Sequence, residues 1–306
     1  MDRKKIWSVS KTIFKIGFTA LLIYLVFQKI DFNQVKSIFL RSDPWYILAA
    51  LIAYFVSQIV SSWRLLSFLR SIDLDLDFGF NFRLYLLGMF YNVFLPGGVG
   101  GDGYKVYLLR KKFQKPTKRI IFSLLLDRVS GLWAIGAISV ALIILIPRIN
   151  IPQTLPIIAL VIGTSLYYWL LRQFFRDYIR YFVQTHFKAI MVQSLQLLSV
   201  ILILLSQDFD GKFSPYLFSF LVSSLATIVP VSIGGFGIRE YVMTHASTVF
   251  DMNQNLAVFT TITFYILSTI AALPGIWFVY KSKEFGPMPP EEEVKKVEAD
   301  LNKDAE

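Results

Sequence analysis

Long apolar runs alternate with short charged segments along most of the chain. An α-helix needs roughly 20 apolar residues to cross about 30 Å of hydrocarbon, and six runs are close to or above this length. Transmembrane β-strands would instead appear as alternating segments of about ten residues, a pattern that the sequence does not contain. We therefore predict an all-α, polytopic membrane protein with about six full spans, at residues 13–27, 45–66, 120–146, 155–171, 189–206 and 256–280.

Two further apolar runs lead into segments rich in glycine and proline. Residues 84–95 continue into Pro96-Gly-Gly-Val-Gly-Gly-Asp-Gly103, and residues 213–229 continue into Pro230-Val-Ser-Ile-Gly-Gly-Phe-Gly237. The first run is too short to cross a bilayer as a helix. An irregular backbone at membrane depth is tolerated only where protein or water surrounds it. We therefore expect residues 81–103 to belong to a re-entrant hairpin, and the second segment to form another one from the opposite face.

The charged segments between the runs predict the topology. Residues 105–119 contain seven basic and no acidic residues, and cytoplasmic loops carry such an excess of Lys and Arg. Arginines at residues 172–180 and lysines after residue 280 place two further helix ends on the same side. The first apolar run lacks the small-residue cleavage site of a signal peptide, so we expect it to be retained as a helix. Both termini are therefore predicted to be cytoplasmic, in a multi-pass protein of the cell membrane.

Composition and charge agree with this topology. The chain has 306 residues, of which 55% are hydrophobic, and a net charge of +10. Residues 284–306 are charged and rich in proline, so we predict a disordered cytoplasmic tail after a transmembrane domain at residues 1–283. The last twenty residues carry a net charge of −4, which leaves +14 on the rest. This excess favours contact with anionic lipid headgroups, although the positive-inside bias explains much of it.

The sequence disfavours several classes of function. No nucleic-acid partner is expected, because the basic residues border membrane spans. The absence of cysteine excludes disulfides and thiolate metal sites, and His186 and His245 lie far apart without a carboxylate cluster, so we expect no metal and no cofactor. Gly98-x-Gly100-x-x-Gly103 resembles a dinucleotide fingerprint, but that motif requires a strand before it and a helix after it.

The two broken segments align with each other over a proline, three glycines and a cation. The aligned pairs, 134 residues apart, are Pro96 with Pro230, Gly100 with Gly234, Gly101 with Gly235, Gly103 with Gly237, and Lys105 with Arg239. Three predicted spans lie between the copies, and this odd number inverts the second copy. Inverted repeats with paired Gly/Pro interruptions are typical of transporters, whose binding site lies where the breaks meet.

The residue types in the repeat suit an anion. Proline ends a helix because it lacks an N–H group, and glycine allows positive φ and close backbone approach. A helix that begins after the break directs free N–H groups and its positive dipole end towards the break, an arrangement that binds phosphate or carboxylate. Lys105 and Arg239 add formal charge, which strengthens such hydrogen bonds. The alternative is that the glycines only allow helices to pack closely.

Asp127 and Arg128 lie within a predicted span, where a charge costs about 2.5–3.5 kcal/mol at the bilayer centre. Adjacent residues on a helix point about 100° apart, so we expect the two to have different partners, with Asp102 and Glu240 as candidates for the cations. The alternative is a structural ion pair, or a position close to the cytoplasmic surface, because Asp127 is only about 12 Å of helix beyond Arg119.

Three further polar residues lie within or at the end of apolar runs. Arg64 has the same alternatives as Asp127 and Arg128, and for Arg64 we favour a charged end that extends to the membrane surface. Asn92 and Gln58 are uncharged, and we expect them to form hydrogen bonds between helices.

These motifs resemble those of the lysylphosphatidylglycerol synthase transmembrane, or flippase-like, family. The resemblance rests on Asn92-Val-Phe-Leu-Pro-Gly-Gly-Val-Gly-Gly-Asp102, Leu126-Asp-Arg128 and Pro230-Val-Ser-Ile-Gly-Gly-Phe-Gly-Ile-Arg-Glu240, and covers roughly residues 10–282. It implies movement of a lipid, often a modified phospholipid, between leaflets. The family usually has Arg where this chain has Lys105, which keeps the charge but loses bidentate geometry. The residues after the last span are too few for the soluble aminoacyl-transferase domain, so lysyl transfer by this chain alone is not expected.

Our leading hypothesis is a lipid translocase whose partner is a membrane phospholipid, anionic or modified. The alternatives are a membrane enzyme or enzyme subunit that modifies lipid headgroups, with Asp102, Asp127 and Glu240 as acid–base candidates, and a scaffold for a separate lipid-modifying transferase. No motif for hydrolytic chemistry is present, so an enzyme is the less favoured class and no catalytic residue is assigned. The candidate headgroup-binding residues are Asn92, Pro96, Gly100, Gly101, Asp102, Lys105, Asp127, Arg128, Pro230, Gly234, Gly235, Gly237, Arg239 and Glu240.

Overall fold

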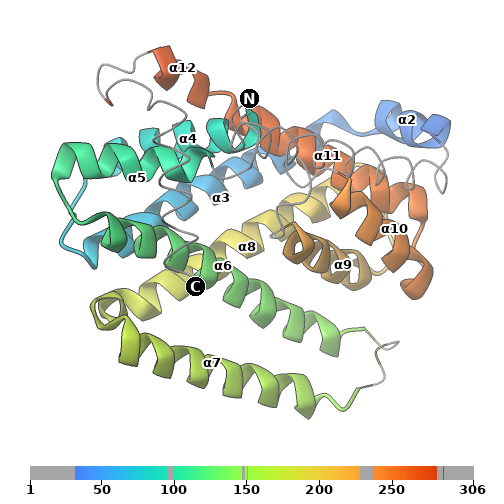
Figure 1. Ribbon diagram of the computed structural model, residues 1–306. Helices are drawn as coiled ribbons and strands as arrows, with labels where there is room; N and C mark the ends of the chain where they lie inside the picture. Colours follow the sequence, from blue (N-terminus) through green and yellow to red (C-terminus); the bar gives the residue numbers. More distant parts are fainter. Residues whose placement is uncertain are drawn as a thin grey trace, which may run out of the picture. The chain divides into compact units, whose positions relative to one another are not determined.

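The computed structural model describes residues 32–94, 100–146, 149, 151–227, 237–280 and 285, and the regular structure of these residues is entirely helical (Figure 1). The all-α prediction is thereby confirmed for this part of the chain. The predicted first span at residues 13–27 and the predicted tail, except Phe285, lie outside the described residues. The helices are α2 (Phe32–Arg41), α3 (Pro44–Arg70), α4 (Phe78–Phe94), α5 (Gly100–Phe113), α6 (Thr117–Ile144), α7 (Thr154–Phe174), the 3₁₀ helix η1 (Arg176–Tyr181), α8 (Phe182–Leu205), α9 (Phe213–Ala226), α10 (Ile238–Phe250), α11 (Gln254–Ala272) and α12 (Gly275–Tyr280).

Five helical segments in the described part of the chain are long and apolar enough to cross a membrane. Each overlaps one of the predicted spans, so five of those six predictions are confirmed as candidate spans, and the protein is a multi-pass membrane protein. The segments are Pro44–Arg70, Thr117–Ile144, Thr154–Phe174, Arg176–Leu205 and Gln254–Tyr280.

Three elements differ from the predictions. Helix α2 was not predicted. Helix α8 begins at Phe182, directly after η1 and several residues before the predicted start of this span at residue 189. The last span is interrupted between α11 and α12 at Pro274, because proline lacks the N–H group that would continue the helical hydrogen bonds.

The chain divides into two compact units, which we describe separately. Unit 1 comprises Met1–Ser57, Ala134–Gly163 and Gln193–Ser268, and unit 2 comprises Gln58–Trp133, Thr164–Val192 and Thr269–Glu306. Helices α2, α9 and α10 belong to unit 1, and α4, α5, η1 and α12 belong to unit 2. The long helices contribute residues to both units.

The core of unit 2 consists of large aliphatic side chains, with Tyr and Phe packed around them. Leu65, Leu69, Leu84, Leu109 and Ile120, from α3, α4, α5 and α6, are at most 1% exposed. In unit 1, an aromatic cluster joins α3, α9 and α11: the Phe264 ring packs edge-on against Phe220 at 4.7 Å and against Tyr54 at 5.2 Å between centroids. Each unit therefore has its own packed interior.

In unit 2, helices α4 and α5 lie side by side (Figure 1), and glycine sets their separation. A Cβ atom on Gly101 would overlap the Gly88 carbonyl oxygen and lie 2.8 Å from Asn92 Oδ1. A Cβ atom on Gly88 would overlap the aliphatic part of Lys105. On the other side of α4, a Cβ atom on Gly275 would overlap the Leu86 carbonyl oxygen. The alternative role of the glycines, which is to let helices pack closely, therefore applies to Gly101.

Unit 1 contains the corresponding pair, because α9 packs against α10 (Figure 1). The helices before the two broken segments have 17 and 14 residues, and those after them have 14 and 13. All four are shorter than a full crossing requires, as expected for helices that enter a membrane part-way. Entry from opposite faces stays a prediction.

The contact at Gly101 predicts a specific sensitivity. We expect Gly101→Ala to lower the free energy of unfolding by about 1–3 kcal/mol, the usual effect of inserting a methyl group into a close-packed contact, with a lower melting temperature of the purified protein in detergent. Gly136→Ala on α6 is the matched control, because a Cβ atom there would meet nothing within 4 Å and alanine favours a helix by about 1 kcal/mol. Equal melting temperatures of the two variants would contradict the proposed contact.

Candidate functional site

The first turns of α5 carry a largely buried carboxylate, Asp102, that joins two cations. Lys105 Nζ donates to Asp102 Oδ1 at 3.1 Å, and Arg128 Nε, from α6, donates to Asp102 Oδ2 at 2.8 Å. A second guanidinium nitrogen of Arg128 also donates to Oδ2. Burial alone raises the pKa of the Asp102 carboxyl, but the two cations outweigh burial and hold that pKa below its ordinary value. This Asp102 cluster (Asp102, Lys105 and Arg128) therefore carries one net positive charge.

The three side chains of the Asp102 cluster differ in exposure. Those of Lys105 and Asp102 are 5% and 15% exposed, whereas that of Arg128 is 52% exposed. Lys105 runs past Gly88, and its Nζ lies 4.6 Å from the centroid of the Tyr85 ring. The buried pair thus fixes one edge of the guanidinium of Arg128, and the rest of that side chain faces outwards.

Asn92 forms the hydrogen bond between helices that the sequence predicts. Its Oδ1 accepts the Gly101 N–H at 2.9 Å, which ties α4 to the first turn of α5. The first N–H groups of a helix have no partner within the helix, and this contact satisfies one of them. The Gly101 N–H, one of the free donors that the sequence predicts for an anionic ligand, is therefore already bonded to Asn92.

Arg64 and Asp127 form a second ion pair in unit 2, between α3 and α6. Arg64 Nε and Nη2 donate to Asp127 Oδ1 and Oδ2 at 2.7 and 3.1 Å, and both residues are buried. The expectation that Arg64 extends to the membrane surface is wrong, because Asp127 holds it inside the unit. The expectation that Asp127 and Arg128 have different partners is confirmed.

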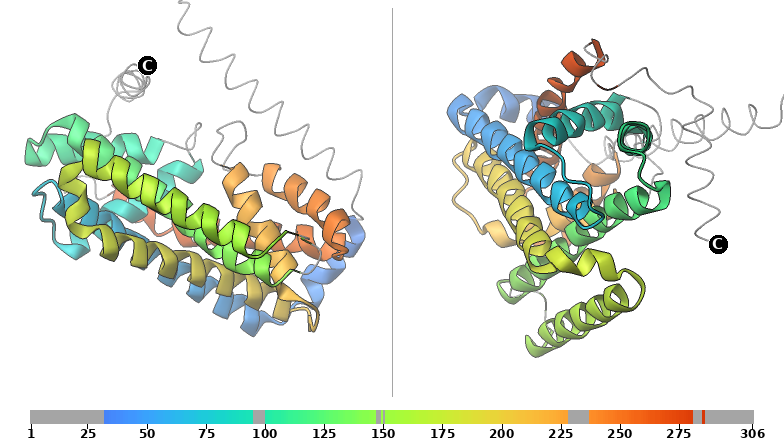
Figure 2. Two further views of the ribbon diagram at one scale, coloured as in Figure 1. Left: turned by 90° about the horizontal axis from the view of Figure 1, so that it is seen from below. Right: turned by 90° about the vertical axis from the view of Figure 1, so that its left-hand side faces the viewer.

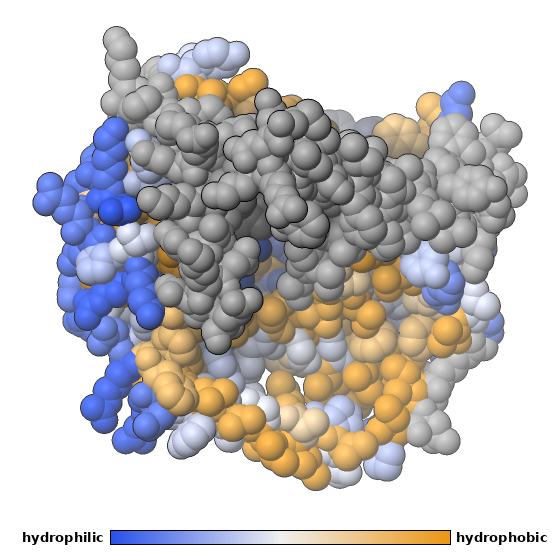
Figure 3. All heavy atoms as spheres, viewed as in Figure 1, coloured by the Kyte–Doolittle hydropathy of each residue, from blue (hydrophilic) through white to orange (hydrophobic). Residues whose placement is uncertain are grey.

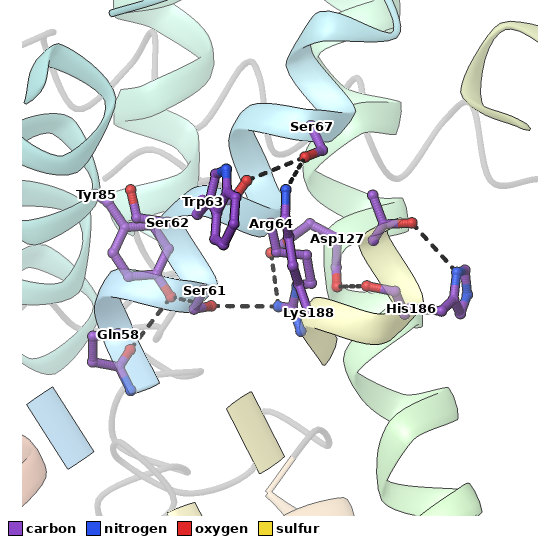
Figure 4. A network of polar contacts seen from close by, with 12 residues as sticks. Gln58, Ser61, Ser62, Trp63, Arg64, Ser67, Tyr85, Asp127, His186 and Lys188 are labelled. Carbon is purple, nitrogen blue, oxygen red and sulfur yellow. Dashed lines mark hydrogen bonds and ion pairs between the residues drawn. The ribbon is translucent and has the colours of Figure 1, made fainter. Parts of the chain in front are cut away.

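A chain of polar contacts connects the Asp102 cluster with the Arg64–Asp127 pair, and Figure 4 shows its part from Tyr85 to Asp127. Tyr85, whose ring lies beside Lys105, donates its hydroxyl hydrogen bond to Ser61 Oγ at 2.8 Å. Ser61 Oγ also accepts from Arg64 Nη2 at 3.4 Å. Gln58 Oε1 lies 3.4 Å from the Tyr85 hydroxyl, so Gln58 also contributes to contact between α3 and α4. Low-dielectric surroundings strengthen such a network.

In unit 1, Glu240 stabilises the start of α10. Gly237 precedes the helix with φ of 87°, a conformation that favours glycine, and its N–H donates to Glu240 Oε2 at 2.7 Å. Thr261, on α11, also forms a hydrogen bond with Glu240. Burial raises the pKa of the Glu240 carboxyl above its ordinary value, although these hydrogen bonds and Arg239 act in the opposite direction. Glu240 is therefore engaged as a helix cap.

Arg239 is held by aromatic rings. Its guanidinium carbon lies 5.4 Å from the centroids of both Phe220 and Phe264, on α9 and α11. Such cation–π contacts gain strength when they are removed from water. Arg239 Nε is buried, and it has no hydrogen-bond partner among the described residues. Arg239 is thus enclosed, in contrast to Arg128.

The structure brings nine of the predicted site residues into two groups, one in each unit. Four predicted residues, Pro96, Pro230, Gly234 and Gly235, lie outside the described residues. Asp127 belongs to the ion pair with Arg64 and not to the Asp102 cluster. Gly100 begins α5, next to Gly101. The groups are Asn92, Gly100, Gly101, Asp102, Lys105 and Arg128 in unit 2, and Gly237, Arg239 and Glu240 in unit 1, with Glu240 in the cap.

Several contributors were not predicted from the sequence. Ser61 was not predicted, and Gln58 and Arg64 were predicted only as separate polar residues. The three recur at a spacing of three residues along α3 and are all buried, and this polar stripe in an apolar helix was the signal that could have identified the network. Neither the burial of Lys188 nor the contact of Phe220 and Phe264 with Arg239 follows from the sequence pattern. Tyr85 offered no signal beyond its position in an apolar run.

A basic surface covers one end of unit 2 (Figure 3). It lies at the connection from α5 to α6 and along η1, and contains one exposed ion pair, Arg119 with Asp177 at 3.3 Å. In contrast, α7 exposes large apolar side chains, among them Ile162 and Phe174, as expected for a helix in lipid. The exposed basic residues are Arg110, Lys111, Lys112, Lys118, Arg119, Arg172, Arg176 and Arg180.

The fold is that of an integral membrane protein, because several of its helices are apolar and long enough to span a bilayer (Figure 2). Short helix pairs lie beside the Gly/Pro segments, and buried ion pairs place charged sites among the helices. Residues 12–275 match the model of the lysylphosphatidylglycerol synthase TM region family, and the chain belongs to that family. This membership connects it with phospholipid modification or translocation. A search of curated proteins finds no match.

The buried pair of Arg64 and Asp127 predicts a large effect on stability. We expect Asp127→Asn to lower the free energy of unfolding by about 3–5 kcal/mol, because it leaves a buried guanidinium without its counter-charge. Asp75→Asn is the matched control: Asp75 pairs with Arg70 at 2.8 Å but its side chain is 78% exposed, so its loss changes the free energy by at most about 1 kcal/mol. Thermal unfolding in detergent measures both, and a similar shift in both variants would contradict the assignment.

Proposed function

We propose that this protein is a lipid translocase that moves an anionic or modified phospholipid between the leaflets of the cell membrane. The Asp102 cluster would bind the headgroup. The observation that carries the proposal is the half-exposed guanidinium of Arg128, which a largely buried carboxylate holds beside a second cation in a membrane protein. Ionisable groups in membrane proteins are expensive and usually mark ligand or ion pathways.

The chemistry of the cluster favours a phosphate group. Asp102 occupies Nε and one terminal nitrogen of Arg128, so the exposed remainder of the guanidinium is free to donate to an anion. Guanidinium–phosphate hydrogen bonds are charge-assisted and directional. One net positive charge matches the single charge of a phosphodiester. The start of α5 adds the positive end of a helix dipole next to the cluster.

Arg239 supports a division of roles between the two copies of the motif. It occupies the position aligned with Lys105, but Phe220 and Phe264 enclose it. Its buried Nε has no hydrogen-bond partner among the described residues, whereas Arg128 has an exposed part that a headgroup can reach directly. We therefore assign first contact with the headgroup to the Asp102 cluster.

A second candidate function is headgroup modification, either by this chain or by a separate transferase that it supports. The three acid–base candidates are Asp102, Asp127 and Glu240, and each is engaged: Asp102 and Asp127 by cations, and Glu240 as a helix cap. Engaged carboxylates favour positioning over proton transfer. Lipid analysis of cells that express only this chain tests the alternative, because a modified phospholipid would appear if the chain catalyses the reaction.

Leaflet exchange measures the proposed activity directly. In vesicles with the purified protein and fluorescent phosphatidylglycerol, we expect faster exchange than in protein-free vesicles. We expect Arg128→Gln to slow this exchange about tenfold or more, because a charge-assisted hydrogen bond contributes about 1.5–3 kcal/mol. Arg172→Gln, which removes an exposed charge at the end of α7, is expected to leave the rate unchanged.

Two outcomes would contradict different parts of the proposal. If fluorescent phosphatidylglycerol, phosphatidylethanolamine and aminoacylated phosphatidylglycerol all exchange as slowly as in protein-free vesicles, translocation is wrong. If exchange is rapid but Arg128→Gln matches the unaltered protein, translocation stands and the headgroup is bound elsewhere.

A further inference from the structure

Unit 2 contains another buried cation, which belongs to neither ion pair. Lys188, on α8, is 5% exposed. Its ammonium donates to Ser67 Oγ at 2.7 Å and lies 4.0 Å from the centroid of the Trp63 ring. Both partners are on α3, and Figure 4 shows the three side chains together. A neutral hydroxyl and an aromatic face therefore surround this charge.

The charge of Lys188 is not balanced by a carboxylate among the described residues of unit 2. Asp127 is held by Arg64, Asp102 by Lys105 and Arg128, and the exposed Asp75 and Asp177 by Arg70 and Arg119. Asp73 and Asp77 are exposed, and neither forms an ion pair with Lys188. The neighbouring Arg64–Asp127 pair is neutral as a whole, so it does not compensate Lys188. Charged side chains inside membrane proteins are expensive and are generally paired with an opposite charge. The Lys188 ammonium has no such counter-charge among these residues, so we expect an anion from outside the chain to supply it.

The surroundings of Lys188 indicate which anion fits. An ammonium group has three donors, and Ser67 takes one of them. Trp63 is 44% exposed, so the ring beside the buried ammonium also reaches the surface of an apolar helix that has the length of a membrane span. Tryptophan is enriched at the level of lipid headgroups, where its ring combines an apolar body with a polar N–H group.

We infer that Lys188, Ser67 and Trp63 form a further binding site, distinct from the Asp102 cluster, for the phosphate group of an anionic phospholipid. The ammonium supplies the counter-charge, the Ser67 hydroxyl orients it, and the Trp63 ring contacts the glycerol and acyl region of the lipid. The site retains a lipid at equilibrium and does not require that the protein translocate it, so this inference goes beyond the proposed function.

Native mass spectrometry of the detergent-solubilised protein tests the site. With phosphatidylglycerol added, we expect the unaltered chain to retain this lipid in preference to phosphatidylcholine. Lys188→Met is expected to weaken retention of phosphatidylglycerol about tenfold and to abolish the preference, whereas Lys188→Arg retains both. Lys212→Gln is the matched control, because it removes one exposed charge from unit 1 and leaves retention unchanged.

A second measurement keeps the inference testable if Lys188→Met does not fold. The fluorescence of Trp63, obtained as the difference between the unaltered chain and Trp63→Phe, is expected to be quenched more by brominated phosphatidylglycerol than by brominated phosphatidylcholine. Equal quenching by the two lipids would overturn the site, as would equal retention of phosphatidylglycerol by folded Lys188→Met.

A test with inorganic phosphate distinguishes a site for the phosphate group of a phospholipid from a site for free phosphate. We expect phosphate alone not to displace the retained phosphatidylglycerol or raise the melting temperature. If phosphate raises the melting temperature of the unaltered chain but not of Lys188→Met, the lipid assignment is overturned in favour of free phosphate. Both measurements are made without leaflet exchange, so failure of the translocase proposal leaves them unaffected.

Discussion

The contact between α4 and α5 at Gly88 and Gly101 sets the geometry on which the candidate site depends. With no side chain at either position, the two backbones approach closely enough for Asn92 to accept the Gly101 N–H. The Lys105 side chain then packs against Gly88 of α4, and its ammonium donates to Asp102, one turn earlier on α5. Any side chain at Gly101 would separate the helices, and the carboxylate, the ammonium and the guanidinium would no longer meet at one point.

The low polarity around the helices explains why the cationic side chains lie beside carboxylates or aromatic rings. A buried cation in such surroundings requires either an anion or a polarisable neighbour. Carboxylates hold Arg64 and Arg128, whereas aromatic rings hold Lys188 and Arg239. The first mode balances the charge and the second does not. The cations with aromatic neighbours therefore keep a residual attraction for anions, and Arg128 keeps one because its carboxylate is shared with Lys105.

The helices and the general location of the charged site could be predicted from the sequence, because apolar length and flanking charge are local properties. The sequence indicated that the adjacent Asp127 and Arg128 need different partners, and it offered Asp102 and Glu240 as candidates for the cations. It did not decide which of the two pairs with Arg128. The partner of Arg64 could not be predicted, because an arginine near the end of a span suits both the membrane surface and the interior. The break at Pro274 is a local effect of proline, so the sequence carried its signal. The burial of Lys188 depends on packing against α3, and helical periodicity carries no information about that neighbour.

The two copies of the repeat show how one spacing gives two different environments. In the first copy the carboxylate precedes the cation by three residues, one helical turn, so Asp102 and Lys105 share a face and can pair. In the second copy Glu240 directly follows Arg239, and adjacent residues diverge by about 100°. Glu240 is thereby directed back to the Gly237 N–H, and Arg239 is left to Phe220 and Phe264. Position relative to the cation thus decides whether the acid neutralises a charge or caps a helix. Only the first arrangement leaves a carboxylate able to fix Arg128 from another helix while part of that arginine stays exposed.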